Sequence, residues 1–141
     1  MAKWRSAAIE RLPELRTLIA SVDNVMALWI ELRIKFEDAY REPRNEDLIG
    51  RIYSYSQWCW NAPRHEDAGH DPSTAATVAF FEDIPKFPPA RQDMPRWFTF
   101  DEIAANKQLF VASIGEIAFQ NLLAHMQRNR NQYVPRPKDM R

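Results

Sequence analysis

The spacing of apolar residues is the feature that most constrains how this chain can fold. In one segment, large apolar side chains recur at intervals of four, three, four and four residues. They are Val25, Trp29, Leu32, Phe36 and Tyr40. This spacing places them on one stripe of a helix. The chain has only three glycines and no Asn-Gly or Asp-Gly pair, so it lacks the signal of a tight β-hairpin. The sequence therefore predicts an all-α fold.

Prolines and capping residues divide this pattern into five to seven helices. The expected helices cover residues 3–20 with an interruption at Pro13, 24–42 after a cap at Asp23, 45–60, 72–83 after a cap at Asp71, 100–112, and 113 onward. Capping boxes are expected at Thr99-x-x-Glu102 and Ser113-x-x-Glu116. The helix after Asp71 is apolar nearly all round, so we expect it near the centre of the bundle.

A proline-rich stretch separates the two halves of the chain. Residues 84–98 contain four prolines, yet they also contain Phe87, Met94, Trp97 and Phe98. We expect an ordered connection, with at most one short helix, held to the core by these apolar side chains. The predicted organisation is one compact helical domain over residues 1–127.

A basic tail is expected at residues 128–141. It carries five basic residues against Asp139 alone: Arg128, Arg130, Arg136, Lys138 and Arg141. A frayed, flexible C-terminus is the favoured interpretation. An arm that binds nucleic acid is the alternative, but it would need more charge and a supporting basic face.

The overall charge limits which partners the chain is expected to bind, and the single cysteine indicates its compartment. Nineteen acidic residues balance nineteen Lys and Arg, so nothing steers the whole chain toward nucleic acid or an anionic membrane. Cys59 is alone and can form no intramolecular disulfide, which fits a reducing compartment. The longest apolar run, Val25 to Ile30, is too short to span a bilayer. The sequence favours a cytoplasmic protein with no membrane association, and no cofactor motif is present.

The stretch His65-Glu66-Asp67-Ala68-Gly69-His70-Asp71 is the strongest candidate for chemistry. A zinc-binding His-Glu-x-x-His helix separates its histidines by four residues, which puts both on one face. Here His65 and His70 are five apart, about 140° around a helix, and flanking prolines disfavour a helix. A metal site using His65, Asp67 and His70 remains one hypothesis, and a metal-dependent hydrolase that adds Glu82 would depend on it. A solvated polar connector is the favoured interpretation.

Two further candidates each have a structural interpretation beside a catalytic one. Cys59 with His65 suggests a nucleophile and its base, but Cys59 lies on an apolar helical stripe, where burial makes a thiol inert. Glu82 and Asp83 follow the apolar helix and suit acid–base chemistry. A salt bridge with Arg91, Arg96 or Arg51 is the favoured interpretation, because acids at a helix C-terminus oppose the helix dipole.

Aromatic side chains form the candidate partner surface. Trp58 lies about 200° from Trp60 around the helix, so both cannot face the same core seam. Packing against the proline-rich stretch is the favoured arrangement. An exposed interface in which Trp58 and Trp97 act with Arg96, Glu82 and Asp83 is the alternative, since Trp and Arg dominate binding hot spots.

Three motifs resemble a family of small bacterial proteins of unknown function. "RIYSYSQWC" at residues 51–59 is similar to the family pattern RIYxYxxWC, "TVAFFE" at 77–82 to AVAFFE, and "PRWFTFDE" at 95–102 to PRWxxxxE. The resemblance extends from about Asp47 to Glu102, about 40% of the chain. The resemblance implies a bacterial, cytoplasmic, helical domain and supplies no catalytic residue. Such proteins are sometimes immunity proteins paired with toxins.

The sequence favours a non-catalytic function. We expect a domain that binds another protein, with an inhibitor or immunity role as its specific form, in which the acidic side would meet a basic partner such as a nuclease. A metal-dependent hydrolase and a structural homo-oligomer remain the alternatives.

Overall fold

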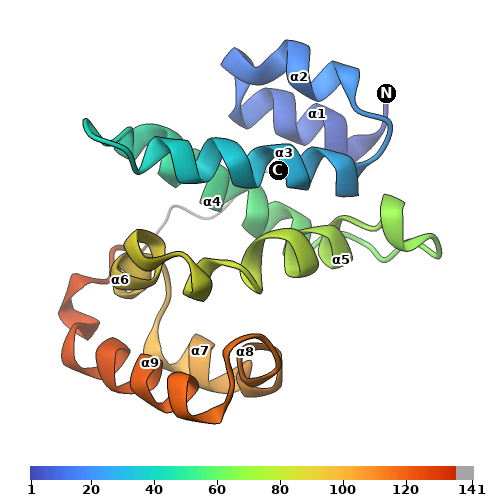
Figure 1. The fold of residues 1–141 in the computed structure, drawn as a ribbon. Coiled ribbons are helices and arrows are strands. Elements are labelled where there is room, and N and C mark those ends of the chain that lie inside the picture. The colour runs from blue at the N-terminus through green and yellow to red at the C-terminus, as the bar shows by residue number, and fades with distance from the viewer. Residues whose placement is uncertain (136–141) are drawn as a thin grey trace. The chain divides into compact units, whose positions relative to one another are not determined.

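The computed structural model of the protein describes residues 1–135, and these residues form helices and no strand (Figure 1). The predicted all-α class is therefore confirmed. Within the described part there are nine α-helices, more than the five to seven expected, because helices break where the pattern seemed continuous. Every helix in that part is too short or too polar to traverse a lipid bilayer.

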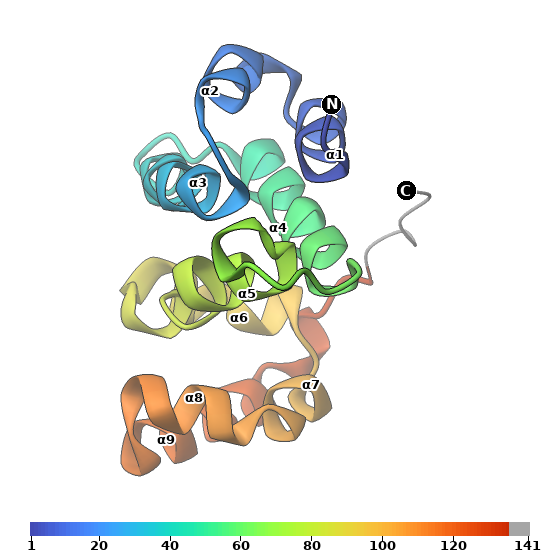
Figure 2. The same ribbon diagram turned by 90° about the vertical axis from the view of Figure 1, so that its right-hand side faces the viewer.

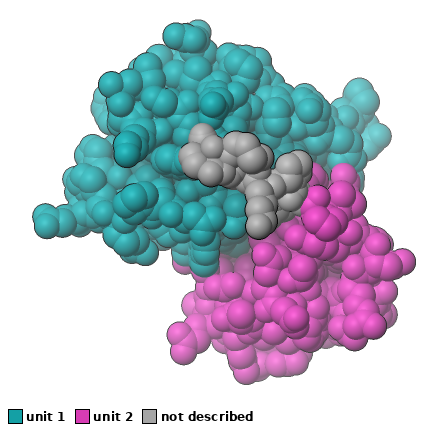
Figure 3. Space-filling view, turned by 180° about the vertical axis from the view of Figure 1, so that it is seen from behind, with its two compact units in different colours: residues 1–81, 138–141 teal, residues 82–137 magenta. Residues whose placement is uncertain are grey.

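The chain divides into two compact units, of which the first comprises residues 1–81 and the second begins at Glu82 (Figure 3). The boundary lies at the end of the apolar segment that was expected to be one central helix. The single domain predicted over residues 1–127 thus spans both units.

The first unit holds five α-helices. They are α1 (Lys3–Arg11), α2 (Arg16–Ser21), α3 (Val25–Ala39), α4 (Glu46–Trp60) and α5 (Pro72–Ala76). A 3₁₀ turn at Pro13–Leu15 separates α1 from α2, so Pro13 interrupts the first predicted helix as expected. A second 3₁₀ turn, Ala68–His70, precedes α5.

Asparagines begin the two longest helices. Asn45 caps α4, because its side-chain oxygen accepts a hydrogen bond from the Leu48 amide at 3.1 Å. Asn24 caps α3 by accepting from the Ala27 amide at 2.8 Å. The predicted cap at Asp23 is wrong by one residue, since both side chains suit the role and only the backbone conformation selects between them.

Aromatic rings form the core of the first unit. The ring of Phe80 lies 4.9 Å from those of Trp29 and Phe36 and 5.4 Å from that of Tyr53, measured between centroids. Trp29 also stacks on Tyr55 at 5.4 Å. All five side chains are buried. Pairs at these separations add favourable ring–ring electrostatics to the burial of apolar surface.

A π-helical turn, Thr77–Phe81, carries Phe80 into that core. It continues directly from α5, so the predicted helix from Asp71 exists but changes its winding after Ala76. α5 packs against both α3 and α4, which confirms its predicted central place in this unit. Ala75 and Ala76 are fully buried there, and their small side chains let the neighbouring helices approach closely.

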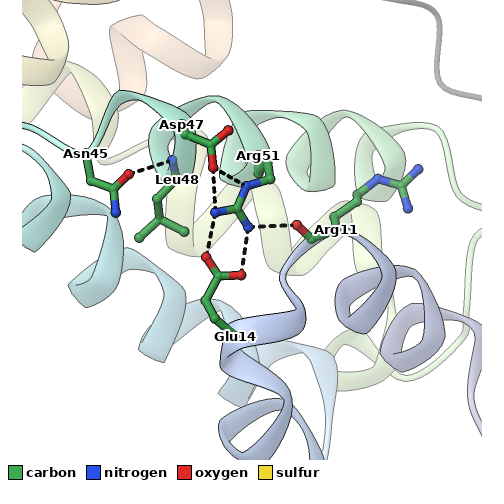
Figure 4. Close-up of polar contacts among 6 residues, drawn as sticks. All are labelled: Arg11, Glu14, Asn45, Asp47, Leu48 and Arg51. Carbon is green, nitrogen blue, oxygen red and sulfur yellow. Dashed lines mark hydrogen bonds and ion pairs between the residues drawn. The ribbon is translucent and has the colours of Figure 1, made fainter.

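Arg51 on α4 holds the corner between α1 and α2 (Figure 4). Its guanidinium donates two hydrogen bonds to the Glu14 carboxylate, at 2.8 and 2.5 Å, and one to the Arg11 carbonyl at 3.0 Å. Asp47, one turn earlier on α4, accepts from the same group at 2.8 Å. This fork-shaped geometry is specific to arginine.

The second unit holds four α-helices. They are α6 (Pro88–Trp97), α7 (Phe100–Ala105), α8 (Lys107–Ile114) and α9 (Glu116–Arg128). A 3₁₀ turn, Ile84–Lys86, precedes α6, and another, Arg130–Gln132, follows α9. α8 and α9 lie side by side (Figure 2).

The proline-rich stretch is more helical than expected. Ten of its residues form α6, with Pro88 at the first position, where its missing amide hydrogen costs no hydrogen bond. Pro95 lies inside the helix, near the C-terminal end, where the loss of one backbone hydrogen bond is tolerated. Met94 and Trp97 are buried, in agreement with the prediction that apolar side chains hold this segment.

Only one of the two predicted capping boxes forms. The Thr99 hydroxyl accepts from the Glu102 amide at 3.1 Å, and the Glu102 carboxylate accepts from the Thr99 amide at 2.8 Å. The second prediction is wrong, because the Ser113 hydroxyl donates to the Glu82 carbonyl instead. Gly115, with φ of 86° and ψ of 165°, makes the turn between α8 and α9.

The helix α9 ends at Arg128, the first residue of the predicted tail. Its first part is held to the second unit: the Val134 amide donates to the Arg96 carbonyl at 3.2 Å. Residues 136–141, with Arg136, Lys138 and Arg141, lie outside the described residues, and the flexibility of the tail stays a prediction.

Replacing Arg51 by lysine tests the corner contact. Arg51→Lys keeps the charge but loses the two-pronged hydrogen bonding, and we expect it to lower the free energy of unfolding by about 0.5–1 kcal/mol. Urea unfolding followed by tryptophan fluorescence measures this loss. Arg16→Lys, at an exposed position, is the matched control. Equal stability of both variants would contradict a structural role for the fork.

The same contact predicts a pH dependence of stability. Hydrogen bonds from Arg51 lower the pKa of Glu14 below its ordinary value of 4.5. A carboxylate with a lowered pKa stabilises the fold above its unfolded pKa, and this contribution is lost as pH falls through the folded pKa. We therefore expect stability to fall less steeply below pH 4.5 in Glu14→Gln than in the wild type or in a Glu66→Gln control. The measurement is the midpoint of urea unfolding at pH values from about 6 to about 3, a range that spans the pKa values of carboxyl groups.

Candidate functional site

The 65–71 loop brings its two histidines together around one residue, Asp67. The Asp67 amide donates to His65 Nδ1 at 3.0 Å, and the Asp67 carboxylate bonds His70 Nδ1 at 3.0 Å. The two imidazole centroids are 5.7 Å apart. The other Asp67 oxygen accepts from the Gly69 amide at 3.0 Å. That amide and the His70 contact lower the pKa of Asp67.

Asp71 anchors the loop to α5. Its carboxylate is buried and accepts hydrogen bonds from the Thr74 hydroxyl at 2.5 Å and the His65 amide at 3.3 Å. Arg64 pairs with it at 3.1 Å. Burial raises the pKa of Asp71, but these partners together outweigh burial and lower it. Asp71 holds the predicted position before α5, although it binds the Thr74 hydroxyl and not a backbone amide of the helix.

The loop does not assemble the hypothesised metal site. Within residues 1–135, no group of three or more His, Cys, Asp or Glu side chains is arranged to hold a metal ion. His65 Nδ1 is already occupied by the Asp67 amide. The exposed residues of the loop bond one another, while Asp71 and the 3₁₀ turn hold the loop to α5 and α3.

Cys59 belongs to the aromatic core. It is fully buried, and the indole Nε1 of Trp29 donates to its sulfur at 3.4 Å. Burial raises the pKa of the thiol to about 12. The prediction that Cys59 packs in the core is confirmed, and such a thiol is a poor nucleophile.

The tryptophans at the end of α4 are partly covered. Trp58 is half-buried and stacks on Tyr55, with centroids 6.1 Å apart and planes at 7°. Trp60 is 38% exposed and packs edge-to-face with Phe81, with ring centroids 5.3 Å apart. Both rings are therefore partly accessible within the first unit.

Trp97 and Arg96 bind each other and a shared carboxylate in the second unit. Trp97 is only 9% exposed, and its indole Nε1 donates to Asp93 at 3.1 Å. Arg96 lies over the Trp97 ring at 5.0 Å and pairs with Asp93 at 3.6 Å. Trp97 thus offers little area to a partner, while the Arg96 side chain stays one-third exposed.

Glu82 and Asp83 are held within the second unit. The Glu82 carbonyl accepts from Ser113, and Asp83 pairs with Lys86 at 3.8 Å. Lys86 was not among the bases expected to pair here, which were arginines at 51, 91 and 96. It lies three residues beyond Asp83 in the following 3₁₀ turn, a contact that depends on the turn and not on the helix before it.

Sequence reasoning missed an exposed apolar pair on α3. Ile30 and Ile34 are 49% and 47% exposed. They are four residues apart, so they lie about 40° from each other on one helix face. Among the large apolar side chains exposed in residues 1–135, these are the two spaced by one helical turn. The available signal was their position off the buried stripe that contains Trp29, Leu32 and Phe36.

The burial of Cys59 predicts its reactivity. At pH 8, well below a thiol pKa of about 12, iodoacetamide should add nothing to the native protein within an hour. In 6 M guanidinium chloride, a concentration of the order that unfolds stable domains, the chain should gain one adduct. Intact-mass spectrometry measures both. Comparable labelling rates in the two states would show that the thiol is accessible.

Comparisons with protein-family models, curated proteins and solved structures give no match for this chain. The resemblance to a bacterial family through the motifs at residues 51–59, 77–82 and 95–102 therefore stays a prediction. The function must be inferred from the side chains and surfaces described above.

Proposed function

We propose that the protein binds another protein without catalysing a reaction, and that Ile30 and Ile34 form the centre of the contact. We call this pair the α3 apolar face. The observation that carries the proposal is that two large aliphatic side chains, one turn apart, are left about half exposed on a fully packed helix. Burying the exposed part of each isoleucine side chain against a partner would contribute roughly 1 kcal/mol to the binding free energy.

The opposite side of α3 holds the face rigid. Leu28, Trp29, Leu32 and Phe36 are buried in the core of the first unit. The helix therefore cannot turn Ile30 and Ile34 inward without removing these side chains from the core. A face that is already fixed before binding loses little conformational entropy when a partner covers it.

The charges beside the face favour a protein partner. α3 carries three acidic residues and two basic ones along its length: Glu31, Glu37, Asp38, Arg33 and Lys35. A mixed polar rim around an apolar centre is typical of protein–protein interfaces. Nucleic acids and anionic membranes require an excess of basic residues, which this helix lacks.

The neighbouring loop supports a partner with basic residues. The 3₁₀ turn Ala68–His70 packs against α3, so the acidic 65–71 loop lies beside that helix. Glu66 and Asp67 are exposed there. A partner that covers the first turns of α3 would meet this negative charge, which fits the proposed inhibitor or immunity role against a basic protein.

The test compares two double variants of α3. Ile30→Ser/Ile34→Ser removes the apolar face, and Glu31→Ser/Lys35→Ser removes two charged side chains at the same spacing without changing the net charge. Partner capture from the native host, quantified by mass spectrometry, should fall at least tenfold for the isoleucine pair, the equivalent of about 1.4 kcal/mol. The control pair should retain most of the capture, because charges at the rim of an interface contribute little to affinity.

Circular dichroism and light scattering complete this test. Both variants should keep the helical spectrum, because the four substituted side chains lie outside the buried stripe. A wild-type dimer that dissociates in Ile30→Ser/Ile34→Ser would contradict binding to a different protein, and it would assign the face to a homo-oligomer. Undiminished capture by the isoleucine variant would contradict the proposed face.

A further inference from the structure

A basic groove lies between α6 and α9 in the second unit, with a volume of about 470 Å³. We propose that this groove binds a phosphate-bearing anion with several charges. The residues around it come from the start of α6, the turn before it and the second half of α9. They are Pro85, Lys86, Pro88, Arg91, Gln92, Asn121, Ala124, His125 and Arg128.

The lining has one sign of charge. Lys86, Arg91 and Arg128 contribute three cations, and no Asp or Glu is among the lining residues. Asp83 lies near Lys86 at 3.8 Å and offsets part of its charge. Arg91 and Arg128 make no ion pair with any residue between 1 and 135. Two guanidinium groups without a counter-charge at one groove are suited to a multiply charged anion.

The walls of the groove are joined by hydrogen bonds that leave the arginines available. His125 Nε2 on α9 bonds the Gln92 carbonyl on α6 at 2.9 Å. Since a carbonyl only accepts, Nε2 carries the hydrogen, and Nδ1 accepts from the Asn129 amide group at 3.2 Å. Both nitrogens of His125 are thus used to position the helices. We assign His125 as a positioning residue and the arginines as the anion ligands.

The start of α6 contributes the positive end of its helix dipole to the groove but few hydrogen-bond donors. Its positive end faces the same region, because Pro88 lines the groove. Pro88 and Pro89 lack amide hydrogens, so the usual backbone site for phosphate at a helix start is missing. Recognition must therefore come from the side chains of Arg91 and Arg128, with Lys86 beside them.

The remaining lining selects the class of ligand. The volume falls within the range of small-molecule sites, about 300–1,000 Å³. No Phe, Tyr or Trp lines the groove, and its one imidazole, that of His125, is held by Gln92 and Asn129, so a nucleobase would find no large ring to stack on. The phosphate chain is then the recognised part, whether it is free or carried by a nucleotide.

Calorimetric titration with sodium tripolyphosphate tests the site in the full-length protein at low ionic strength. Arg91→Gln and Arg128→Gln should each weaken binding roughly tenfold, since a charged hydrogen bond contributes about 1.5–3 kcal/mol. Arg16→Gln, at an exposed position of the first unit, should bind as the wild type does. Magnesium-free ATP should bind as tightly as tripolyphosphate, because only phosphates are contacted.

Each other outcome would overturn the proposal. One is the absence of tripolyphosphate binding at millimolar concentrations, which correspond to a binding free energy of about 4 kcal/mol. Another is a loss of affinity in Arg16→Gln as large as in the Arg91 and Arg128 variants. The third is a protein that binds ATP but does not bind tripolyphosphate. Arg91→Lys guards against a variant that misfolds, since it should keep the charge and most of the affinity. Ile30→Ser/Ile34→Ser should bind tripolyphosphate normally, so failure of this site and failure of the proposed protein interface are distinguishable.

Discussion

The contact of Phe80 with three other aromatic rings is the interaction on which the first unit depends. It joins α3, through Trp29 and Phe36, to α4, through Tyr53, and it draws the π-helical turn into the core. With α3 fixed on this side, its other side must face outward and expose isoleucine. The apolar face is therefore a product of the core: the same packing that buries one stripe of the helix orients the other.

The helices that could be predicted are those defined by contacts between near neighbours in sequence. The stripe from Val25 to Tyr40 and the Thr99 capping box depend on residues three and four apart, and both appear as expected. The predictions that were wrong concern contacts between residues distant in sequence, or positions where two neighbouring residues suit the same role. Ser113 bonds Glu82, thirty-one residues away, which no local pattern reveals. Pro95 is tolerated in a helix because it lies close to the end.

The candidate surfaces were harder to predict than the fold. The sequence could show that residues 65–71 form no α-helix with both histidines on one face, because the interval between the histidines is a local property. The α6–α9 groove could not be predicted, since its cations, Lys86, Arg91 and Arg128, are far apart in sequence and converge only after folding. Trp97 illustrates a third case. Its residue type suggests an interface, yet Asp93 satisfies its indole and the ring is buried.

Gly115 makes the turn between α8 and α9 with a backbone conformation that, in practice, only glycine adopts. An added methyl group would meet no atom within 4 Å, so the restriction comes from the backbone and not from crowding. Any sequence proposed as a descendant of the same ancestor must keep glycine at this place or connect the two helices differently. Substitution at this position would therefore strain the connection between the two helices without creating a side-chain clash.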